Sequence, residues 1–266
     1  MNKTELLDKL ARDGEERLVL ARALDKLNTA QRKNIPAYTG FLSPAERSGV
    51  ERLIAAAQYP RHLFWGGFPQ AERTVCVFLP DWQEEEEFLA LGEEGPLSAL
   101  RCTFPRGSGL THRDFLGAIL GQGITREKIG DLLVGEDRCD IIVLRELEDY
   151  LRLNLTSAGR VSLKVSPLPL SEIQVPQQRV SLVRDTVAAP RLDAVAASAF
   201  SLSRGKAADL ISAGRLLLNY RECTKPDRAV AEGDVLSCRG LGKCSVKRLG
   251  GRTKKGRLLL ELERYR

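Results

Sequence analysis

The sequence lacks the features that would place the chain in a membrane or direct it out of the cell. It contains no run of about 18 apolar residues, the length that a transmembrane helix requires. Its N-terminal segment is charged throughout and has no apolar signal core. The hydrophobic fraction of 43% is ordinary for a soluble globular protein. We therefore expect a cytoplasmic protein without membrane association.

Metal-binding patterns are also missing. The chain has 6 cysteines and 2 histidines, and no two cysteines are spaced as Cys-x-x-Cys. Zinc sites are usually built from closely spaced thiolates and imidazoles, so we expect no metal and no cofactor. Cys238 and Cys244 could approach each other in a hairpin, but reduced cysteines that pack in the interior are the favoured interpretation.

Catalytic signatures are scarce as well. No Walker motif is present. The glycines of "FWGGFPQ" precede a predicted strand, whereas a methyltransferase needs its glycine-rich cofactor loop after one. His112 and Asp114 could support acid–base chemistry, but no nucleophile or metal partner accompanies them. We predict no catalytic residues and no enzymatic activity.

Positive charge is in excess, and the excess is confined to one end of the chain. The formal net charge is +6. Residues 191–266 contain 17 Lys and Arg against 8 Asp and Glu, whereas residues 1–190 contain 24 bases and 27 acids. This asymmetry indicates a polyanion-binding module attached to a nearly neutral body.

Hydrophobic periodicity predicts an α+β body. Apolar spacing favours a helix over 3–28. A second helix should begin after Ser43, because Pro44 and Glu46 follow it in a capping-box pattern. Packed layers of helix and sheet are more consistent with this pattern than a long doubly wound sheet. We further predict strands at 73–79, 97–104, 138–144 and 160–168, and helices that start at 84–87 and cover 111–120, 125–134 and 145–155.

The basic module has a simpler outline. A helix is predicted at 192–199, and a second helix should run from Ser203 to a left-handed stop at Gly214. Strands around basic turns follow, so the outline is two helices and a small basic β-sheet. Residues 181–191 are predicted to connect the body to this module.

The second helix has bases where acids are expected. A helix N-terminus carries partial positive charge, so Arg204 and Lys206 each cost a few tenths of a kcal/mol, and Gly205 costs up to about 1 kcal/mol relative to alanine. Several broken local rules at one place often mark a functional site. We predict that backbone NH groups, Arg204 and Lys206 converge on a phosphate; the alternative is that both side chains are simply solvated.

A second basic stretch, "KRLGGRTKKGR", covers residues 247–257. Each phosphate that such a stretch contacts adds to a salt-dependent affinity. Its bases are Lys247, Arg248, Arg252, Lys254, Lys255 and Arg257.

Residues 191–240 carry a recognisable pattern. It consists of Arg191-Leu192-Asp193, Ser203-Arg204, Ile211-Ser212-Ala213-Gly214, Leu216-Leu217-Leu218-Asn219 and Gly233-Asp234. With these elements the segment resembles the S4 RNA-binding domain. Tyr220 departs from the pattern, since a glycine often follows the asparagine. The resemblance implies that folded RNA is held by Arg191, Ser203, Arg204, Lys206 and Lys225.

The remaining chain is similar to the YlmH family, also called photosystem-II-S4-type. The segments that carry the resemblance are "FLSPAERSGVERLI", "FWGGFPQAER", "LTHRDFLGAILGQGITREKIGDLLV" and "GRTKKGR". Membership implies a central RRM-like α/β domain (71–180) and a C-terminal S4 domain (188–266), and the apolar spacing described above adds an N-terminal helical region (1–70). It also implies association with the large ribosomal subunit and tRNA in the rescue of obstructed, stalled subunits.

The body offers a possible second contact with RNA or the ribosome at His112, Arg113, Arg126 and Lys128. The alternative is a helix start with capping and surface charges, and both remain open. The strands at 73–79 and 97–104 lack the aromatic signature with which RRM sheets stack on bases. We therefore do not expect RNA binding in the standard RRM manner; the domain could contact a ribosomal protein or position the S4 domain.

The predicted function is that of a monomeric, non-enzymatic protein that recognises the shape of structured rRNA or tRNA on the large ribosomal subunit. One alternative is an RNA-modifying enzyme with an appended S4 domain. The Arg-Leu-Asp triplet that a pseudouridine synthase needs occurs only at 191–193, inside the S4 pattern. Another alternative is a scaffold for cell-division proteins, which would not need the basic module.

Overall fold

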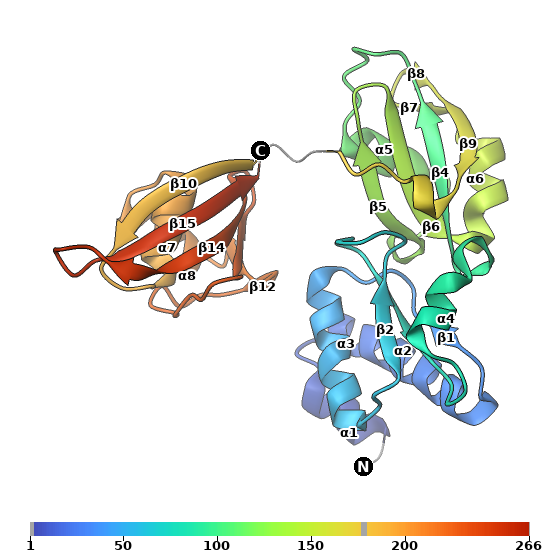
Figure 1. Ribbon diagram of the computed structural model, residues 1–266, viewed down its shortest axis with the longest axis horizontal. Helices are drawn as coiled ribbons and strands as arrows, with labels where there is room; N and C mark the ends of the chain where they lie inside the picture. Colours follow the sequence, from blue (N-terminus) through green and yellow to red (C-terminus); the bar gives the residue numbers. More distant parts are fainter. Residues whose placement is uncertain (1–2, 177–179, 266) are drawn as a thin grey trace. The chain divides into compact units, whose positions relative to one another are not determined.

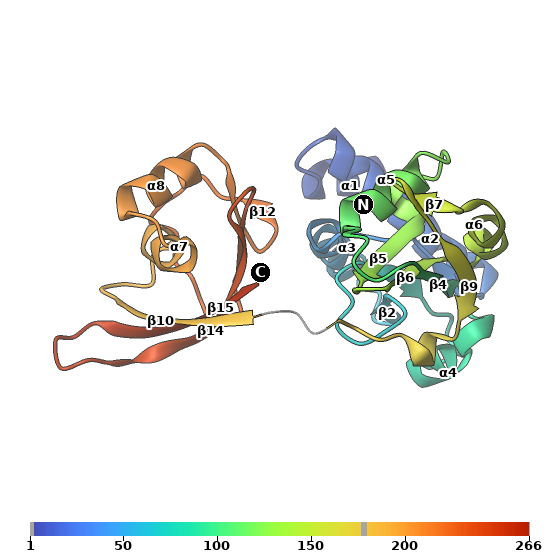
Figure 2. The same ribbon diagram turned by 90° about the horizontal axis from the view of Figure 1, so that it is seen from above.

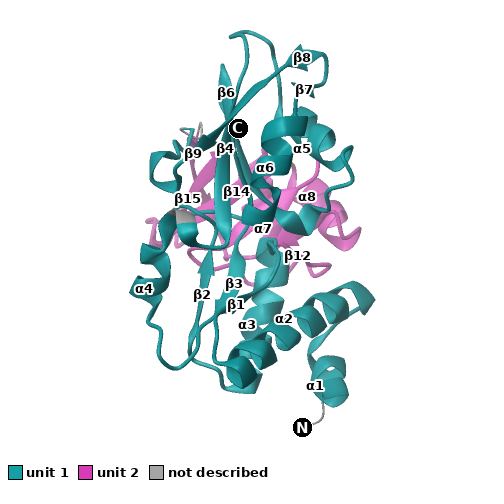
Figure 3. Ribbon diagram, turned by 90° about the vertical axis from the view of Figure 1, so that its right-hand side faces the viewer, with its two compact units in different colours: residues 1–176 teal, residues 177–266 magenta. Residues whose placement is uncertain are grey.

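The computed structural model describes residues 3–176 and 180–265 (Figures 1 and 2). The chain divides into two compact units, which are coloured separately in Figure 3. The first unit is Met1–Pro176 and the second is Gln177–Arg266. Among the described residues, no helix has both the length and the apolar character to cross a membrane. The predicted boundary at residue 70 falls inside the first unit, so the division into three domains stays a prediction.

The N-terminal part of the first unit packs helices against a small sheet. The predicted helix over 3–28 is two helices, because Asp13 interrupts it and accepts a hydrogen bond from the Glu16 amide at 2.8 Å as an N-cap. The capping box at Ser43 and Glu46 is confirmed. The strand His62–Trp65 was not predicted from the sequence. Its aromatic side chains are partly buried. The elements are α1 (Lys3–Leu10), α2 (Gly14–Lys33), α3 (Pro44–Ala57), and a sheet of order β1 (Ala37–Tyr38), β3 (Val75–Phe78) and β2 (His62–Trp65).

The central part is an antiparallel sheet with two helices, α5 and α6, packed on one face. The predicted helix at 125–134 is wrong. Only the 3-10 turn η2 (Arg126–Lys128) is helical, and the residues after it form strand β5, where Ile129 and Leu132 join the core. The sheet order is β5 (Ile129–Val134), β6 (Arg138–Leu144), β4 (Leu97–Thr103) and β9 (Lys164–Leu168). The other elements are α4 (Glu85–Ala90), η1 (Gly92–Glu94), α5 (His112–Leu120), η3 (Arg145–Leu147), α6 (Glu148–Asn154), β7 (Ser157–Ala158), β8 (Val161–Ser162) and η4 (Leu170–Glu172).

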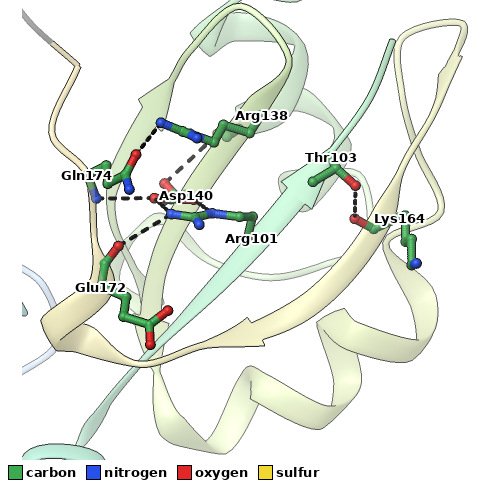
Figure 4. A network of polar contacts seen from close by, with 8 residues as sticks. Arg101, Thr103, Arg138, Asp140, Lys164, Glu172 and Gln174 are labelled. Atoms are coloured by element: carbon green, nitrogen blue, oxygen red, sulfur yellow. Dashed lines mark hydrogen bonds and ion pairs between the residues drawn. The ribbon is translucent and has the colours of Figure 1, made fainter.

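The opposite face of this sheet is largely covered. At one end, Ile142 and Leu144 pack in a cluster with Phe41 from the N-terminal part. At the other end, Arg101 donates two hydrogen bonds of 2.7 Å to the buried carboxylate of Asp140, which also accepts from the Gln174 amide (Figure 4). The chain that follows β9 is thereby held across the face on which an RRM would stack bases.

The contact between Gly130 and Phe41 gives a test of this shared core. A Cβ atom at position 130 would lie 2.7 Å from the Phe41 ring, which is 2% exposed. We expect Gly130→Ala to lower the free energy of unfolding by about 1–3 kcal/mol, because the ring must move within a packed core. Chemical denaturation measures it. Gly117→Ala in α5 is the control and should instead raise stability by up to about 1 kcal/mol, since alanine favours a helix and its Cβ meets no described atom within 4 Å apart from chain neighbours and its own helix backbone. An unchanged midpoint for Gly130→Ala would refute the contact.

The second unit has helices α7 (Leu192–Phe200) and α8 (Arg204–Ser212) on one face of a sheet (Figure 2). The predicted outline of two helices and a basic sheet is confirmed, and Gly214 adopts the left-handed φ of +68° that ends α8. The interpretation of residues 181–191 as a connection is wrong for their first part. Val180–Val187 forms strand β10, which pairs with β15 along its whole length. Its Val183 and Val187 pack against the core of the unit. The sheet order is β10, β15 (Leu258–Tyr265), β14 (Gly242–Arg252), β13 (Val235–Cys238), β11 (Leu216–Leu218) and β12 (Arg221–Glu222).

The cysteines agree with the sequence interpretation. All 6 lie in described residues and are free thiols. In the hairpin of β13 and β14, Cys244 is opposite Leu236 and Cys238 is opposite Gly242, so the two cysteines do not face each other. Burial raises the pKa of the Cys244 thiol to about 11, which keeps it protonated and unreactive at neutral pH.

Candidate nucleic-acid interface

The start of α7 is organised around the carboxylate of Asp193, of which 7% is exposed. Arg191 donates to it through Nε and Nη2, both at 3.2 Å. Arg204, from the first turn of α8, donates through Nε at 3.0 Å and Nη2 at 3.3 Å. Burial alone would raise the pKa of Asp193, but the hydrogen bonds from Arg191 and Arg204 lower it. One ionised carboxylate thus orients two guanidinium groups, one directly before α7 and one in the first turn of α8. We call Arg191 and Arg204, held by Asp193, the Asp193 pair.

This pair explains why a base stands in the first turn of α8. Arg204 is not simply a solvated side chain, because it offsets the buried charge of Asp193. Its side chain is still 57% exposed, so it remains accessible to a ligand. Neither sequence alternative included a structural partner for Arg204, which pairs with Asp193 and also faces solvent.

The loop before Val230 holds further bases beside this pair. The amides of Leu192 and Asp193 donate to the carbonyls of Arg228 at 2.8 Å and Pro226 at 2.9 Å. The first amides of α7 are therefore occupied by protein and are not free for a phosphate. Lys225 and Arg228 are exposed, and neither side chain has a partner in the described part of the chain. Sequence reasoning missed Arg228, although the turn "KPDR" contains both bases.

The first turn of α8 has an N-cap, and its surface is open to solvent. The Ser203 hydroxyl accepts a hydrogen bond from the Lys206 amide at 3.2 Å, so this side chain acts as the N-cap. The Lys206 ammonium group is exposed and has no partner among the described residues. No described atom lies within 4 Å of a Cβ placed on Gly205. A ligand backbone can therefore approach this turn closely.

Residues 247–257, the basic hairpin, form the end of β14 and the turn that leads to β15. Its turn is closed by hydrogen bonds between the Thr253 amide and the Arg257 carbonyl at 2.8 Å and from the Gly256 amide to the Thr253 carbonyl at 2.8 Å. Lys247 donates to Glu263 at 2.6 Å, which raises the pKa of this lysine. Arg257 donates to the hydroxyl of Thr186 at 2.9 Å and to its carbonyl. The hairpin bases that are exposed and have no partner in the described residues are Arg248, Arg252, Lys254 and Lys255.

The basic hairpin and the Asp193 pair lie at the same end of the second unit. Val187, the last residue of β10, is paired with Leu258, directly after the hairpin. Only residues 188–190 then separate β10 from Arg191 (Figure 1). Two basic groups that are far apart in sequence are thus brought to one end of the fold.

The possible second contact in the first unit is mostly engaged by protein. The capping box of Thr111 and Asp114 is present, so the capping interpretation of this helix start is confirmed. Arg126 donates to the carbonyls of Ile129 at 2.9 Å and Gly130 at 3.2 Å. Burial, with the neighbouring Arg73, lowers the pKa of Arg126 to about 10.

The other three residues of this group differ in their environments. Lys128 pairs with Glu146 at 2.9 Å. Burial and the nearby Arg126 lower the pKa of His112, which keeps its imidazole neutral at pH 7. Of the four predicted residues, Arg113 is the exposed, permanently charged side chain that has no partner in the described structure.

Comparison with known proteins identifies both domains. Residues 190–236 match the model of the S4 domain, and residues 102–172 match a model described as "Putative RNA-binding domain in YlmH". With an S4 domain and clustered cations, the chain is of the RNA-binding class.

The whole chain has a curated relative. It is 32% identical over 253 residues, 95% of this chain and 96% of the relative, to "Ribosome-associated protein quality control protein P2" of Bacillus subtilis (strain 168). The chain therefore belongs to the YlmH family. A solved structure, "Cell division protein ylmH from Streptococcus pneumoniae", aligns with 22% identity and a TM-score of 0.49, covering 61% of this chain and 96% of that one.

Proposed function

We propose that this protein is a non-enzymatic factor that binds structured rRNA or tRNA on the large ribosomal subunit and acts in the quality control of stalled nascent chains. The observation that carries the proposal is the set of exposed cations at one end of the second unit, beside the Asp193 pair, that have no partner in the described residues. The name of the relative, which matches over 95% of the chain, supports the ribosomal setting.

The geometry supports recognition of RNA shape. Arg191 and Arg204 are held by Asp193 as a fixed pair of planar donors, a form suited to phosphate oxygens. Lys206, in the first turn of α8, and Lys225 and Arg228, in the loop that contacts the start of α7, add exposed positive charge. The basic hairpin extends the contact along the RNA backbone, and Lys247 and Arg257 add their positive charge to it beside their protein partners. Ser203 contributes by capping α8. Contacts of this kind carry little base specificity, so discrimination would come from the fold of the RNA.

A catalytic role for the body is not favoured. The carboxylate of Asp114 accepts hydrogen bonds from the Thr111 hydroxyl and amide, and these lower its pKa. A base with such a pKa is a poor proton acceptor at neutral pH. We propose that the protein acts as a cytoplasmic monomer.

Gly205 gives a test in which stability and binding change in opposite directions. Gly205→Ala should raise the free energy of unfolding by up to about 1 kcal/mol, because alanine is the better helix former and the site is open. It should weaken binding of purified large-subunit rRNA by about tenfold, because the methyl group blocks close approach. Filter binding and thermal melting measure the two effects. Ser212→Ala, exposed at the other end of α8, should change neither. Unchanged RNA binding by Gly205→Ala would argue against a ligand at this turn.

The proposed function itself is tested by crosslinking and sequencing of bound RNA from cells, together with sedimentation of the protein with separated ribosomal subunits. Recovery of large-subunit rRNA and tRNA, with the protein in the large-subunit fraction, is the expected result. Recovery of no RNA, with the protein at the top of the gradient, would overturn the proposal.

A further inference from the structure

The first unit contains an apolar pocket of about 350 Å³ that is separate from the candidate interface. It lies where α4 and η1 meet the chain around η4, which Figure 2 shows beside α4. Leu89 and Val175 line it and are 37% and 50% exposed, so apolar surface remains uncovered there. Deeper lining residues include Trp65, Phe68, Phe88 and Leu97.

The segment that provides much of this pocket is strongly acidic. Residues 81–94 contain 7 acids and no base. The first unit has 22 bases and 26 acids in all. The negative charge of residues 81–94 is therefore larger than the net negative charge of the whole unit. Glu84 pairs with Arg61 at 3.0 Å. Glu85, Glu86 and Glu94 are exposed and have no partner in the described residues.

We infer that this pocket binds a bulky apolar side chain presented by a lysine- and arginine-rich segment of a partner protein. The pocket volume suits a single large side chain, and such anchors dominate protein–protein affinity. The carboxylates on α4 and η1 supply charge complementarity for the flanking bases of the partner. RNA does not fit, because its phosphates would be repelled by Glu85, Glu86 and Glu94, which have no cationic partner within the described ranges.

This docking site is independent of the proposed RNA interface. Its residues all belong to the first unit, whereas the proposed RNA contacts at the Asp193 pair and the basic hairpin belong to the second. A basic partner segment would engage the acidic first unit while the second unit holds RNA. Variants of the pocket are therefore expected to keep their affinity for RNA.

The test uses the full chain and fluorescein-labelled synthetic peptides, with fluorescence anisotropy as the readout. One short peptide consists of Lys, Arg and Ser with a single central Phe, and its match has Ala in that position. The Phe peptide should bind at least about tenfold more tightly than the Ala peptide. Leu89→Gln combined with Val175→Gln should abolish this difference. Glu85→Gln combined with Glu86→Gln should weaken the binding of both peptides and make that binding less dependent on salt concentration.

Matched controls separate the pocket from the general surface. Leu153→Gln removes an apolar side chain that is 65% exposed on α6, and Glu15→Gln with Glu136→Gln removes two exposed charges elsewhere in the first unit. Both controls should leave binding of the two peptides unchanged, and thermal melting should show all variants to be folded.

Three results would overturn the inference. The first is equal binding of the Phe and Ala peptides. The second is a pocket variant that loses affinity for large-subunit rRNA, which would make the site part of an RNA contact. The third is a pocket variant that gains RNA affinity, which would mean that the basic second unit of the chain itself occupies the pocket. If the wild-type protein did not bind RNA, the proposed function would be refuted, but the inference about the pocket would be unaffected.

Discussion

Exchange of the four unpaired cations of the basic hairpin for glutamine is expected to lower the affinity for large-subunit rRNA at least about a hundredfold at physiological salt. Each phosphate contact contributes a slope of about 0.9 to the dependence of log affinity on log salt, so the slope should fall by about 3–4. Filter binding over a salt series measures both. The side chains are exposed and have no partner in the described residues, so the variant should melt like wild type. The four positions are Arg248, Arg252, Lys254 and Lys255.

Two comparisons sharpen this result. Glutamine at four exposed bases of the first unit removes the same charge elsewhere and should change affinity little; these bases are Lys9, Arg12, Arg32 and Lys33. Lys247→Gln within the hairpin should have a smaller effect than any unpaired position, because Lys247 is already engaged by Glu263. If the distant variant lost as much affinity as the hairpin variant, net charge rather than the hairpin would be responsible.

Asp193→Asn is expected to weaken RNA binding even though it removes a negative charge from a basic surface. The two guanidinium groups would lose the carboxylate that orients them, because asparagine has no negative charge, keeps one acceptor oxygen and places an NH2 donor where the second oxygen was. The unfolding free energy of the second unit should fall by about 1–3 kcal/mol at pH 7. Asp227→Asn, which removes an exposed charge near Arg191, is the control and should bind RNA slightly more tightly. Equal affinity of the two variants would contradict the orienting role.

The pH dependence of stability tests the same pair. The pKa of Asp193 is lower in the folded chain than its ordinary value of about 3.9. The contribution to stability is therefore fully present above that ordinary value and is lost as the pH falls through the folded pKa. Asp193→Asn should show a smaller loss of stability between neutral pH and pH of about 3 than wild type does. Parallel loss in both proteins would mean that the pair stores no such stability.

Local signals in the sequence predicted several features of the second unit correctly. Ser203 caps α8, Gly214 ends it with a positive φ, and the basic excess lies in this unit. Each of these depends on residues close together in sequence, where backbone conformation and short side chains decide the outcome. The capping boxes at Ser43 and Thr111 were predictable for the same reason.

Other features depended on distant residues and were mispredicted. The segment 125–134 has helix-compatible composition, yet β5 forms because β6 lies alongside it and Phe41 packs on Gly130. Residues 181–191 were predicted to be a connection, but their first part pairs with β15 at the far end of the chain. Pairing in a sheet can override a weak local preference for helix, because the backbone hydrogen bonds and the buried side chains both stabilise the strand.

In the candidate interface, the sequence and the tertiary structure determine different features. By itself, the sequence determined the RNA-binding class, the S4 pattern and which bases were available, because charge and local motifs require no knowledge of packing. The tertiary structure decided which bases are free: Asp193 holds Arg204 from 11 residues away, Glu263 engages Lys247, and Thr186 engages Arg257. Ion pairs and hydrogen bonds form through space, so only the folded chain separates the side chains that hold the protein together from those left for RNA.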